Sequence, residues 1–219
     1  MPPEPFVLGF DTSAAHCAAA LLCGSRLLTA RQEQMEKGQA ERLIPLLEEL
    51  LAEGGIGWGD LSAIGVGIGP GNFTGIRIAV SAARGLALAL NIPSVGVSAF
   101  EALALGLPRP LLATVDARRD MIYGQVLEGD APAAEPFLIA AAQPPSALCG
   151  SGIGCVGACA GPWADPLAGP ALSPVYPPAE AVARIASERF RTPLPRPAPL
   201  YLRSADAAPP SDLPPVLLP

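Results

Sequence analysis

The first hundred residues alternate between strand-like and helix-like spacing of their apolar positions. Residues 6–10 form an apolar run that predicts a short buried strand. Residues 17–22 and 27–31 predict two further strands, which a glycine-serine turn joins as a hairpin. Leucines and one isoleucine recur over residues 39–53 at the spacing of an amphipathic helix, which a pair of glycines ends. The pattern therefore predicts three strands followed by a helix.

The alternation continues for another fifty residues. Residues 63–68 predict an apolar strand, and a glycine-rich turn leads from it into a helix over residues 73–90. Residues 94–97 predict a strand, and residues 99–106 predict a short helix. Three strands followed by helix, strand, helix and strand are typical of a mixed sheet with helices packed on it.

Prolines change the pattern halfway along the chain. Eight of the 27 prolines lie in residues 1–130 and nineteen in residues 131–219, so the second part cannot consist of long helices. Pro108 and Pro110 interrupt the periodicity and mark the seam between two domains. We predict an N-terminal domain, a proline-rich C-terminal domain and a flexible tail over residues 1–104, 105–204 and 205–219.

Composition predicts a soluble, cytoplasmic protein. Only 16% of the 219 residues are charged, yet no uninterrupted apolar run reaches the roughly 18–20 residues of a membrane span. The first residues carry no basic cluster, so no signal peptide is expected. The cysteines form no C-x-x-C pair, which argues against disulfides and structural zinc. We expect reduced core thiols at Cys17, Cys23, Cys149, Cys155 and Cys159.

The charge balance disfavours a chain that binds nucleic acid unaided. Fourteen basic side chains face twenty acidic ones, giving a net charge of −6. Residues 1–104 hold six basic and ten acidic side chains, and residues 105–219 hold eight and ten. Neither half is therefore a basic nucleic-acid domain, and any such role is shared with a partner.

Two phosphate-binding motifs fail on inspection. Residues 152–157 spell G-x-G-x-x-G, but Pro162 and Pro166 follow at once and are expected to prevent the helix that a dinucleotide site needs. The chain has no G-x-x-x-x-G-K-[ST] string, and Lys37 is its only lysine. A Walker-type NTPase is therefore excluded.

A third glycine-rich stretch, Gly-Pro-Gly-Asn-Phe-Thr-Gly-Ile-Arg over residues 69–77, leaves two interpretations open. Its backbone N–H groups, together with the following helix dipole, can hold an anion. Alternatively it is a tight strand-to-helix connection that Asn72 or Thr74 caps. The helix that follows mixes small residues with apolar bulk on more than one face, so it is either buried or a partner interface.

Catalytic side chains are scarce. His16, the only histidine, follows a polar turn and is expected to be solvated, so no histidine metal pair and no Ser-His-Asp triad is predicted. Asp11 at the end of the first strand, and Asp116 with Arg118 after the strand at 111–115, are the best placed polar residues. Such carboxylates hold a hydrated Mg²⁺ or a ribose, or merely cap turns, and both interpretations stay open.

Several segments together resemble the bacterial TsaB (YeaZ) family over residues 6–203. In order and spacing they are Leu8-Gly9-Phe10-Asp11-Thr12-Ser13, residues 69–78, Gly85-Leu86-Ala87, Gly96-Val97-Ser98, Asp116-Ala117-Arg118 and Pro199-Leu200-Tyr201-Leu202-Arg203. The string over residues 69–77 is highly specific, whereas the Asp-Thr-Ser and Asp-Ala-Arg pieces are weak alone.

The resemblance implies an α/β protein of the actin/Hsp70/sugar-kinase-like (ASKHA) fold, with two domains that each hold a mixed sheet and packed helices. It implies a non-catalytic scaffold for threonylcarbamoyl transfer to the adenosine beside the anticodon of tRNAs that read codons starting with A. The related catalytic subunit TsaD carries a metal-binding His-x-x-x-His on its first long helix, and residues 39–43 here contain no histidine. The chain departs from the family's usual residues at two positions: Gln39 lies near a position that is commonly histidine, and Asn72 replaces a more frequent serine. Neither change affects the backbone role of the glycines.

The resemblance also implies partners. It predicts a heterodimer with TsaD through the helices at 39–53 and 73–90, docking of the ATPase TsaE, tRNA contact only through the complex, and no membrane. A homodimer through the same helices is expected when TsaD is absent. No cofactor or metal is expected on this subunit, since ATP and Mg²⁺ are used by the complex. The residues expected at the interface are Leu43, Leu47, Phe73, Ile76, Val80, Ala83 and Ala87.

A second set is expected to contact a nucleotide or an anion: Asp11, Gly69, Gly71, Thr74, Arg77, Asp116 and Arg118. Arg119 and Arg203 join Arg77 and Arg118 as candidates for local tRNA contacts, with surface salt bridges as the alternative. The rival function is an enzyme of the same fold. A small-molecule kinase would hold ATP between Asp11, Asp116, Gly150 and Gly152, whereas a glycoprotease-type peptidase lacks its metal ligands and triad.

Overall fold

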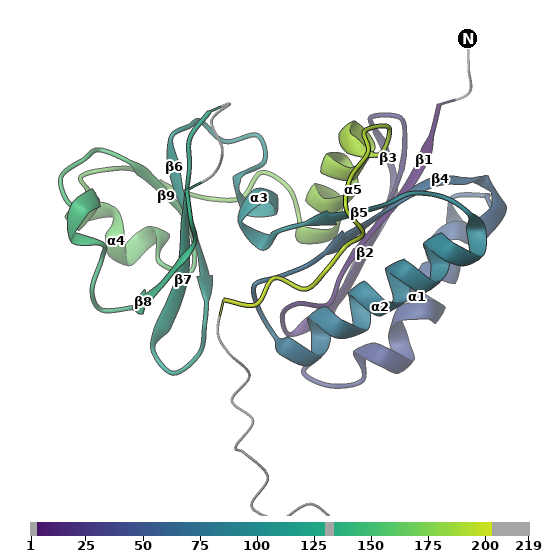
Figure 1. The fold of residues 1–219 in the computed structure, drawn as a ribbon, viewed down its shortest axis with the longest axis horizontal. Coiled ribbons are helices and arrows are strands. Elements are labelled where there is room, and N and C mark those ends of the chain that lie inside the picture. The colour runs from purple at the N-terminus through teal and green to yellow at the C-terminus, as the bar shows by residue number, and fades with distance from the viewer. Residues whose placement is uncertain (1–3, 130–133, 203–219) are drawn as a thin grey trace, which may run out of the picture.

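A computed structural model describes residues 4–129 and 134–202, which form two five-stranded mixed sheets with helices packed on them (Figure 1). The first sheet has the strand order β3-β2-β1-β4-β5. Its strands are β1 (Phe6–Asp11), β2 (His16–Cys23), β3 (Arg26–Gln34), β4 (Leu61–Gly67) and β5 (Ser94–Val97).

The second sheet has the order β10-β9-β6-β7-β8. Its strands are β6 (Leu111–Asp116), β7 (Met121–Leu127), β8 (Phe137–Ala140), β9 (Gly154–Gly157) and β10 (Ala171–Leu172). In each sheet three consecutive strands run antiparallel, and two later strands add in parallel on the other side of the first. The two halves therefore repeat one topology, and the expected fold class, a two-domain ASKHA-like α/β fold, is confirmed.

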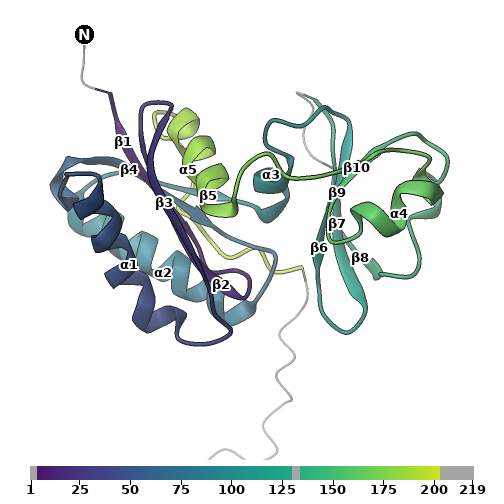
Figure 2. The same ribbon diagram turned by 180° about the vertical axis from the view of Figure 1, so that it is seen from behind.

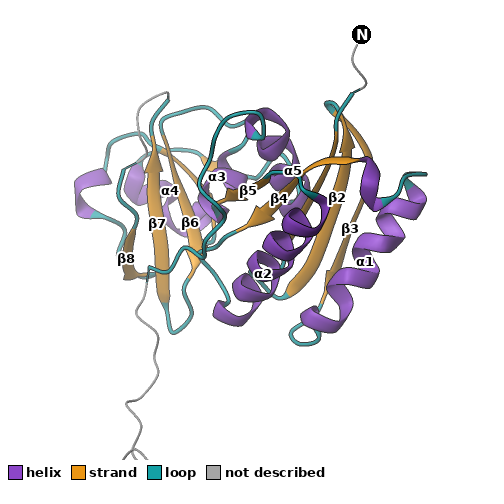
Figure 3. Cartoon of the chain, turned by 45° about the vertical axis from the view of Figure 1, so that its right-hand side comes forward, coloured by secondary structure: helices purple, strands orange, loops and turns teal. Residues whose placement is uncertain are grey.

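Helices cover both faces of the first sheet. The α-helices are α1 (Gln39–Glu53), α2 (Phe73–Leu90), α3 (Ala99–Ala104), α4 (Ala160–Leu167) and α5 (Pro178–Arg189). Alternate residues of β2 point to opposite sides, so Cys17, Ala19 and Leu21 pack with α1 and α2, while Ala18 and Ala20 pack with α5. Figure 3 shows α1 and α2 side by side on one face of this sheet, and α5 lies on the other.

The last helix of each half packs on the sheet of the other half. α5, which follows the second sheet in sequence, lies on β1 and β4 of the first, and a Cβ added to Gly9 would come within 2.6 Å of the Cβ of Ala183. α3, which follows the first sheet, packs its Phe100 and Ala104 in one cluster with Leu111 and Ala113 of β6. Figure 2 shows both helices between the two sheets. The two halves are therefore interlocked.

The chain after α5 returns along the first half. Pro197 lies against Gly96 of β5, and the N–H of Leu200 donates to the carbonyl of Ile68 at 2.8 Å. Leu200 also packs on the apolar cluster of the second half, so this segment contacts both sheets. The division into domains over residues 1–104 and 105–204 stays a prediction, and the predicted tail at 205–219, like Arg203, lies outside the described residues.

Two local predictions are wrong. The helix that Pro162 and Pro166 were expected to prevent is present as α4. Pro162 sits in its first turn, where backbone N–H groups have no intrahelical partner, and Pro166 sits in its last turn. β3 runs on to Gln34, three residues beyond its predicted end, because its polar residues form an exposed edge whose Arg31 and Glu33 pair with α1.

The cysteines divide into buried and accessible thiols. Cys17, Cys155 and Cys159 are buried, Cys23 is half-buried, and Cys149 is exposed, so the prediction of a core thiol is wrong for Cys149. Burial raises the pKa of Cys17 and of Cys155 to about 11. These two thiols therefore stay protonated, and weakly nucleophilic, well above neutral pH.

Iodoacetamide at pH 8 is expected to modify Cys149 first, because it is exposed and because the pKa of Cys17 and Cys155 is raised to about 11. Cys17, Cys155 and Cys159 should react only after urea unfolds the chain. Peptide mass spectrometry at successive times measures the order, with the urea sample as the control. Labelling of Cys17 as fast as Cys149 in the native protein would contradict the described packing.

Candidate functional site

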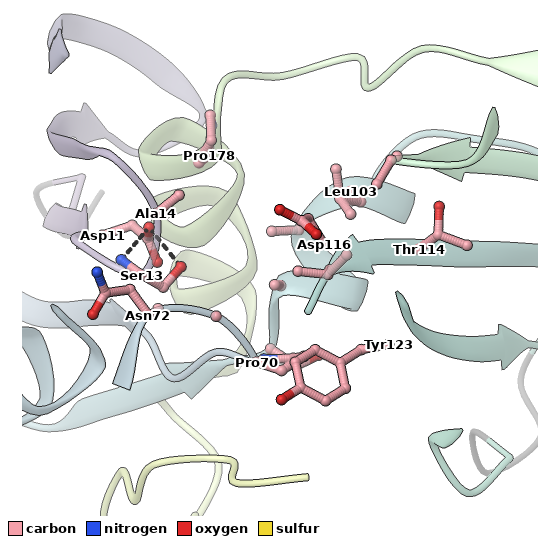
Figure 4. Close-up of a pocket in the computed structure, with 18 of the residues that line it drawn as sticks. Asp11, Ser13, Ala14, Pro70, Asn72, Leu103, Thr114, Asp116, Tyr123 and Pro178 are labelled. Carbon is pink, nitrogen blue, oxygen red and sulfur yellow. Dashed lines mark hydrogen bonds between the residues drawn. The ribbon is translucent and has the colours of Figure 1, made fainter. Parts of the chain in front are cut away.

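A cavity of about 550 Å³ lies between the two halves, at the ends of β1 and β6 (Figure 4). Asp11 and Ser13 reach it from the first half, and Asp116 and Arg118 reach it from the second. Clefts of this size between domains are usual binding sites for small molecules. The interdomain cleft is therefore the candidate site, and its chemistry follows from the two strand-end carboxylates.

Asp11 is held by three donors on one oxygen. Its Oδ1 accepts from the Ser13 N–H at 2.9 Å, from Ser13 Oγ at 2.9 Å and from His16 Nε2 at 2.7 Å. Since a carboxylate only accepts, His16 donates through Nε2. The expectation of a solvated His16 is wrong, because this residue begins β2 and only 7% of it is exposed.

This geometry does not activate a nucleophile. In a Ser-His-Asp triad the imidazole bridges the hydroxyl and the carboxylate. Here Ser13 and His16 both donate to the same carboxylate oxygen, so the histidine is not positioned to take the proton of Ser13. Among the described residues no group of three or more His, Cys, Asp or Glu side chains is arranged to hold a metal ion. The contacts around Asp11 therefore serve to position its carboxylate.

Asp116 occupies the corresponding place in the second half. It ends β6 as Asp11 ends β1, and its Oδ1 accepts from the Arg118 N–H at 2.9 Å, the same two-residue spacing as in Ser13 and Asp11. The turn that follows keeps three successive non-glycine residues at positive φ, between 52° and 61°, at positions 118–120. Backbone of this kind is uncommon outside glycine and is concentrated at functional sites.

The glycine-rich stretch after β4 connects a strand to a helix. Asn72 caps α2, because its Oδ1 accepts from the N–H groups of Thr74 and Gly75 at 3.0 and 3.3 Å. Thr12 Oγ1 donates to the carbonyl of Gly75 at 2.7 Å, and the Asn72 N–H donates to the carbonyl of Ser13 at 2.6 Å. This arrangement favours the capped connection over the anion loop, since these groups already have partners.

The glycines of this stretch are needed for close approach. A Cβ on Gly75 would collide with the carbonyl oxygen of Thr12, and one on Gly71 would collide with that of Ser13. The N-terminus of α2 therefore packs backbone to backbone on the β1–β2 turn. The specific sequence string is explained by this contact, which holds the turn that follows Asp11.

The structure brings together only part of the residues expected to contact a nucleotide or an anion. Asp11, Gly71, Asp116 and Arg118 line the cleft. The other predicted contacts of this kind, and the two glycines of the kinase hypothesis, are absent from its lining: Gly69, Thr74, Arg77, Gly150 and Gly152.

Arg77 is used outside the cleft. Its guanidinium lies 3.8 Å from the ring centre of Phe73, and its Nε donates to the Tyr201 hydroxyl at 2.8 Å.

Inside the cleft, Arg118 is the only Arg or Lys of the described lining, and the negative charges of Asp11 and Asp116 repel an anion. The charged side chains of the described lining therefore disfavour direct contact with phosphate groups.

The predicted partner interface is mostly core. Only Phe73, 38% exposed, is at the surface. The remaining six are buried: Leu43, Leu47, Ile76, Val80, Ala83 and Ala87. This prediction is wrong for those six, because the apolar stripe of each helix faces its own sheet. The large apolar residues that are exposed on these helices are instead Ile44 on α1 and Leu88 on α2, besides Phe73. In the sequence they can be recognised as apolar residues that lie outside the apolar stripe of their helix.

Ion pairs fasten α1 to the edge strand β3. Arg42 binds Glu33 and Glu49, and Arg31 binds Glu49 and Glu53. Hydrogen bonds from Arg42 lower the pKa of the Glu33 and Glu49 carboxyl groups. These arginines are therefore occupied within the chain and do not contribute to an anion site.

Comparison with known proteins adds a family context. A family model described as "TsaD: tRNA N6-adenosine threonylcarbamoyltransferase" matches residues 32–134. The protein TsaB of Escherichia coli K12, named for tRNA threonylcarbamoyladenosine biosynthesis, is 34% identical over 122 residues, which make up 53% of this chain and 52% of that protein. TsaB of Bacillus subtilis 168 is 36% identical over 123 residues, 53% of this chain and 52% of that protein. The chain thus spans about half the length of the curated relatives it matches.

Solved structures are similar over nearly the whole chain. An uncharacterized protein from Pseudomonas aeruginosa, described as similar to peptidase YEAZ, has a TM-score of 0.73 and 25% identity, and the match covers 91% of this chain and 100% of that one. YeaZ from Pseudomonas aeruginosa has a TM-score of 0.65 and 27% identity, with 90% and 100% covered. The similarity therefore extends across both halves.

Two glycines of α2 should respond to alanine with opposite signs. Gly75→Ala places a methyl group on the carbonyl of Thr12, so we expect a loss of about 2 kcal/mol or more in the free energy of unfolding. Gly85 has open space around it, so Gly85→Ala should stabilise the helix by about 0.5–1 kcal/mol. Urea unfolding monitored by circular dichroism measures both. Equal effects of the two changes would disprove the backbone contact.

Proposed function

The chain belongs to the TsaB (YeaZ) family, and we propose that it serves tRNA threonylcarbamoyladenosine biosynthesis as a non-catalytic subunit that binds and stabilises TsaD. In this proposal the group transferred to the adenosine beside the anticodon is handled by TsaD. The proposal is supported by the names of the relatives and by the apolar surface that the chain leaves uncovered.

The observation that carries the proposal is the exposed side of α2. This helix is long and apolar enough to cross a membrane by length and composition, yet only 33% of it is buried. One such helix is weak evidence for a membrane span, because a helix packed on a sheet passes the same test. Leu88 is 80% exposed, and the neighbouring Gly85 and Ala89 are exposed as well. Ser81 and Arg84 are exposed beside them, so a large apolar side chain stands among small and polar ones, a mixture that fits a contact surface for a partner protein.

The geometry of the interface follows from which residues are accessible. Ile44 and Pro45 on α1 and Phe73 and Leu88 on α2 are exposed, and the two helices pack beside each other. Small residues on the outer side of α2 allow a partner helix to approach closely. We place the contact with TsaD, and a homodimer in its absence, on these outer faces in place of the buried positions.

The remaining parts of the proposal concern the chemistry of the complex. Ser13 and His16 are both committed to Asp11, so we assign no catalytic step to this subunit. ATP and Mg²⁺ then act elsewhere in the complex, with TsaE as the ATPase. tRNA is contacted through the assembled complex, because this subunit is acidic. In this proposal the protein acts in the cytoplasm.

Leu88→Glu is expected to weaken binding of TsaD by roughly tenfold or more, because it puts a charge into a desolvated contact. The free energy of unfolding should change by less than about 0.5 kcal/mol, since the side chain is on the surface. Binding is measured by calorimetry with purified TsaD.

Val175→Glu is the matched control: it is also an exposed apolar residue, but it lies between β10 and α5, away from α1 and α2. It should bind TsaD as the unchanged chain does. Failure of the unchanged chain to bind TsaD would overturn the proposed function. Undiminished binding by Leu88→Glu would overturn the placement of the contact on this part of α2.

A further inference from the structure

One oxygen of Asp11 is not used by the described chain. Oδ1 receives all three hydrogen bonds that reach this side chain, and Oδ2 receives none. Asp11 is only 5% exposed, yet no fully buried side-chain nitrogen or oxygen of the described residues lacks a partner. Oδ2 is therefore not sealed in the interior, and it opens to the cleft that Asp11 lines.

Gly67 of β4 makes room for this oxygen. A Cβ at position 67 would collide with Oδ2 of Asp11. The carboxylate is thus fixed on one side by Ser13 and His16 and lies against bare backbone on the other. An acceptor held in this way offers its free lone pairs in one fixed direction.

Asp116 offers a second free carboxylate oxygen from the opposite wall. Its Oδ1 accepts from the Arg118 N–H, and its Oδ2 has no partner in the described chain. Figure 4 shows Asp11 and Asp116 on opposite sides of the same cavity. The two halves therefore present equivalent acceptors to whatever lies between them.

The rest of the cleft is suited to an apolar body. Its wall includes Pro70, Val97, Leu103 and Val182, and the ring of Tyr123. Ionised carboxylates accept and cannot donate, so a ligand must bring its own donors. A phosphate would bring further acceptors and negative charge to two carboxylates, with Arg118 as the one Arg or Lys of the described lining.

We infer that the interdomain cleft binds a small molecule that presents hydroxyl or ammonium donors to Asp11 and Asp116 and lays an apolar body against the wall, and that it does not select phosphates. Hydroxyl and ammonium groups both donate hydrogen bonds, and the two carboxylates accept them. The cavity of about 550 Å³ accommodates a ligand of nucleoside size. This ligand site goes beyond the proposed scaffold role and does not depend on TsaD.

Calorimetric titration of the full chain alone tests the inference with three probes. Adenosine carries hydroxyl donors without charge, tyramine carries an ammonium group on an aromatic body, and ATP with Mg²⁺ carries phosphates. Binding of adenosine or of tyramine at least tenfold tighter than that of ATP with Mg²⁺ is expected, and the tighter of the two identifies the donor. Tighter binding of ATP with Mg²⁺, or no binding of adenosine and tyramine at millimolar concentration, would overturn the inference.

Asparagine substitutions reverse the polarity of the atom that faces the ligand. In Asp116→Asn the amide oxygen keeps the Arg118 N–H, while the amide nitrogen replaces the free acceptor by a donor. Asp11→Asn does the same beside Ser13 and His16. Each change should weaken binding of the probe about tenfold or more, since hydrogen bonds to charged groups are the stronger ones.

Asp120→Asn is the matched control, because Asp120 lies on the same hairpin as Asp116 and does not line the cavity. The affinity of the Asp120→Asn variant for the probe should equal that of the unchanged chain. Asp116 is exposed, so the Asp116→Asn variant keeps its fold even where Asp11→Asn does not, and circular dichroism checks both. Undiminished binding by Asp116→Asn would overturn the assignment of the site.

Discussion

The turn between β1 and β2 packs backbone against backbone on the N-terminus of α2. Gly71 and Gly75 allow this approach, and Thr12 and Ser13 contribute the hydrogen bonds that hold it. The contact fixes the direction in which Asp11 faces the cleft and also the direction in which α2 presents its outer side. A partner on α2 and a ligand in the cleft would therefore contact one rigid unit, in which a displacement on either side is transmitted through packed backbone.

The two halves share a topology, but they treat their equivalent carboxylates differently. Asp11 is buried and receives extra donors from Ser13 and His16, whereas Asp116 is exposed and, within residues 4–129 and 134–202, accepts only from a backbone N–H. The first carboxylate is consequently immobilised, while the second can adjust to what it meets. Duplicated folds commonly retain the backbone and diverge in the site, because few side chains decide the chemistry of a site.

The elements with strong periodicity could be predicted from the sequence, and the contacts between them could not. The helices at 39–53 and 73–90 and the strand at 94–97 are found where the pattern places them. The prediction of the interface residues was wrong because an apolar stripe on a helix looks the same in the sequence whether it packs on a sheet of its own chain or on a partner. Asp11 could be identified from the sequence as a carboxylate at the end of a strand. Its hydrogen bond with His16 could not be predicted, because the polar residues before His16 suggest a turn and give no sign that β2 begins at His16.

The exchange of α3 and α5 between the halves bears on how the chain acquires its structure during synthesis. The first sheet is complete in sequence at Val97, but one of its faces is covered by α5, which ends at Arg189. Until the ribosome has released that helix, Ala18 and Ala20 have no apolar surface to pack on. The N-terminal half therefore cannot finish folding as an independent unit ahead of the rest of the chain, and its last contacts are among the most distant in sequence.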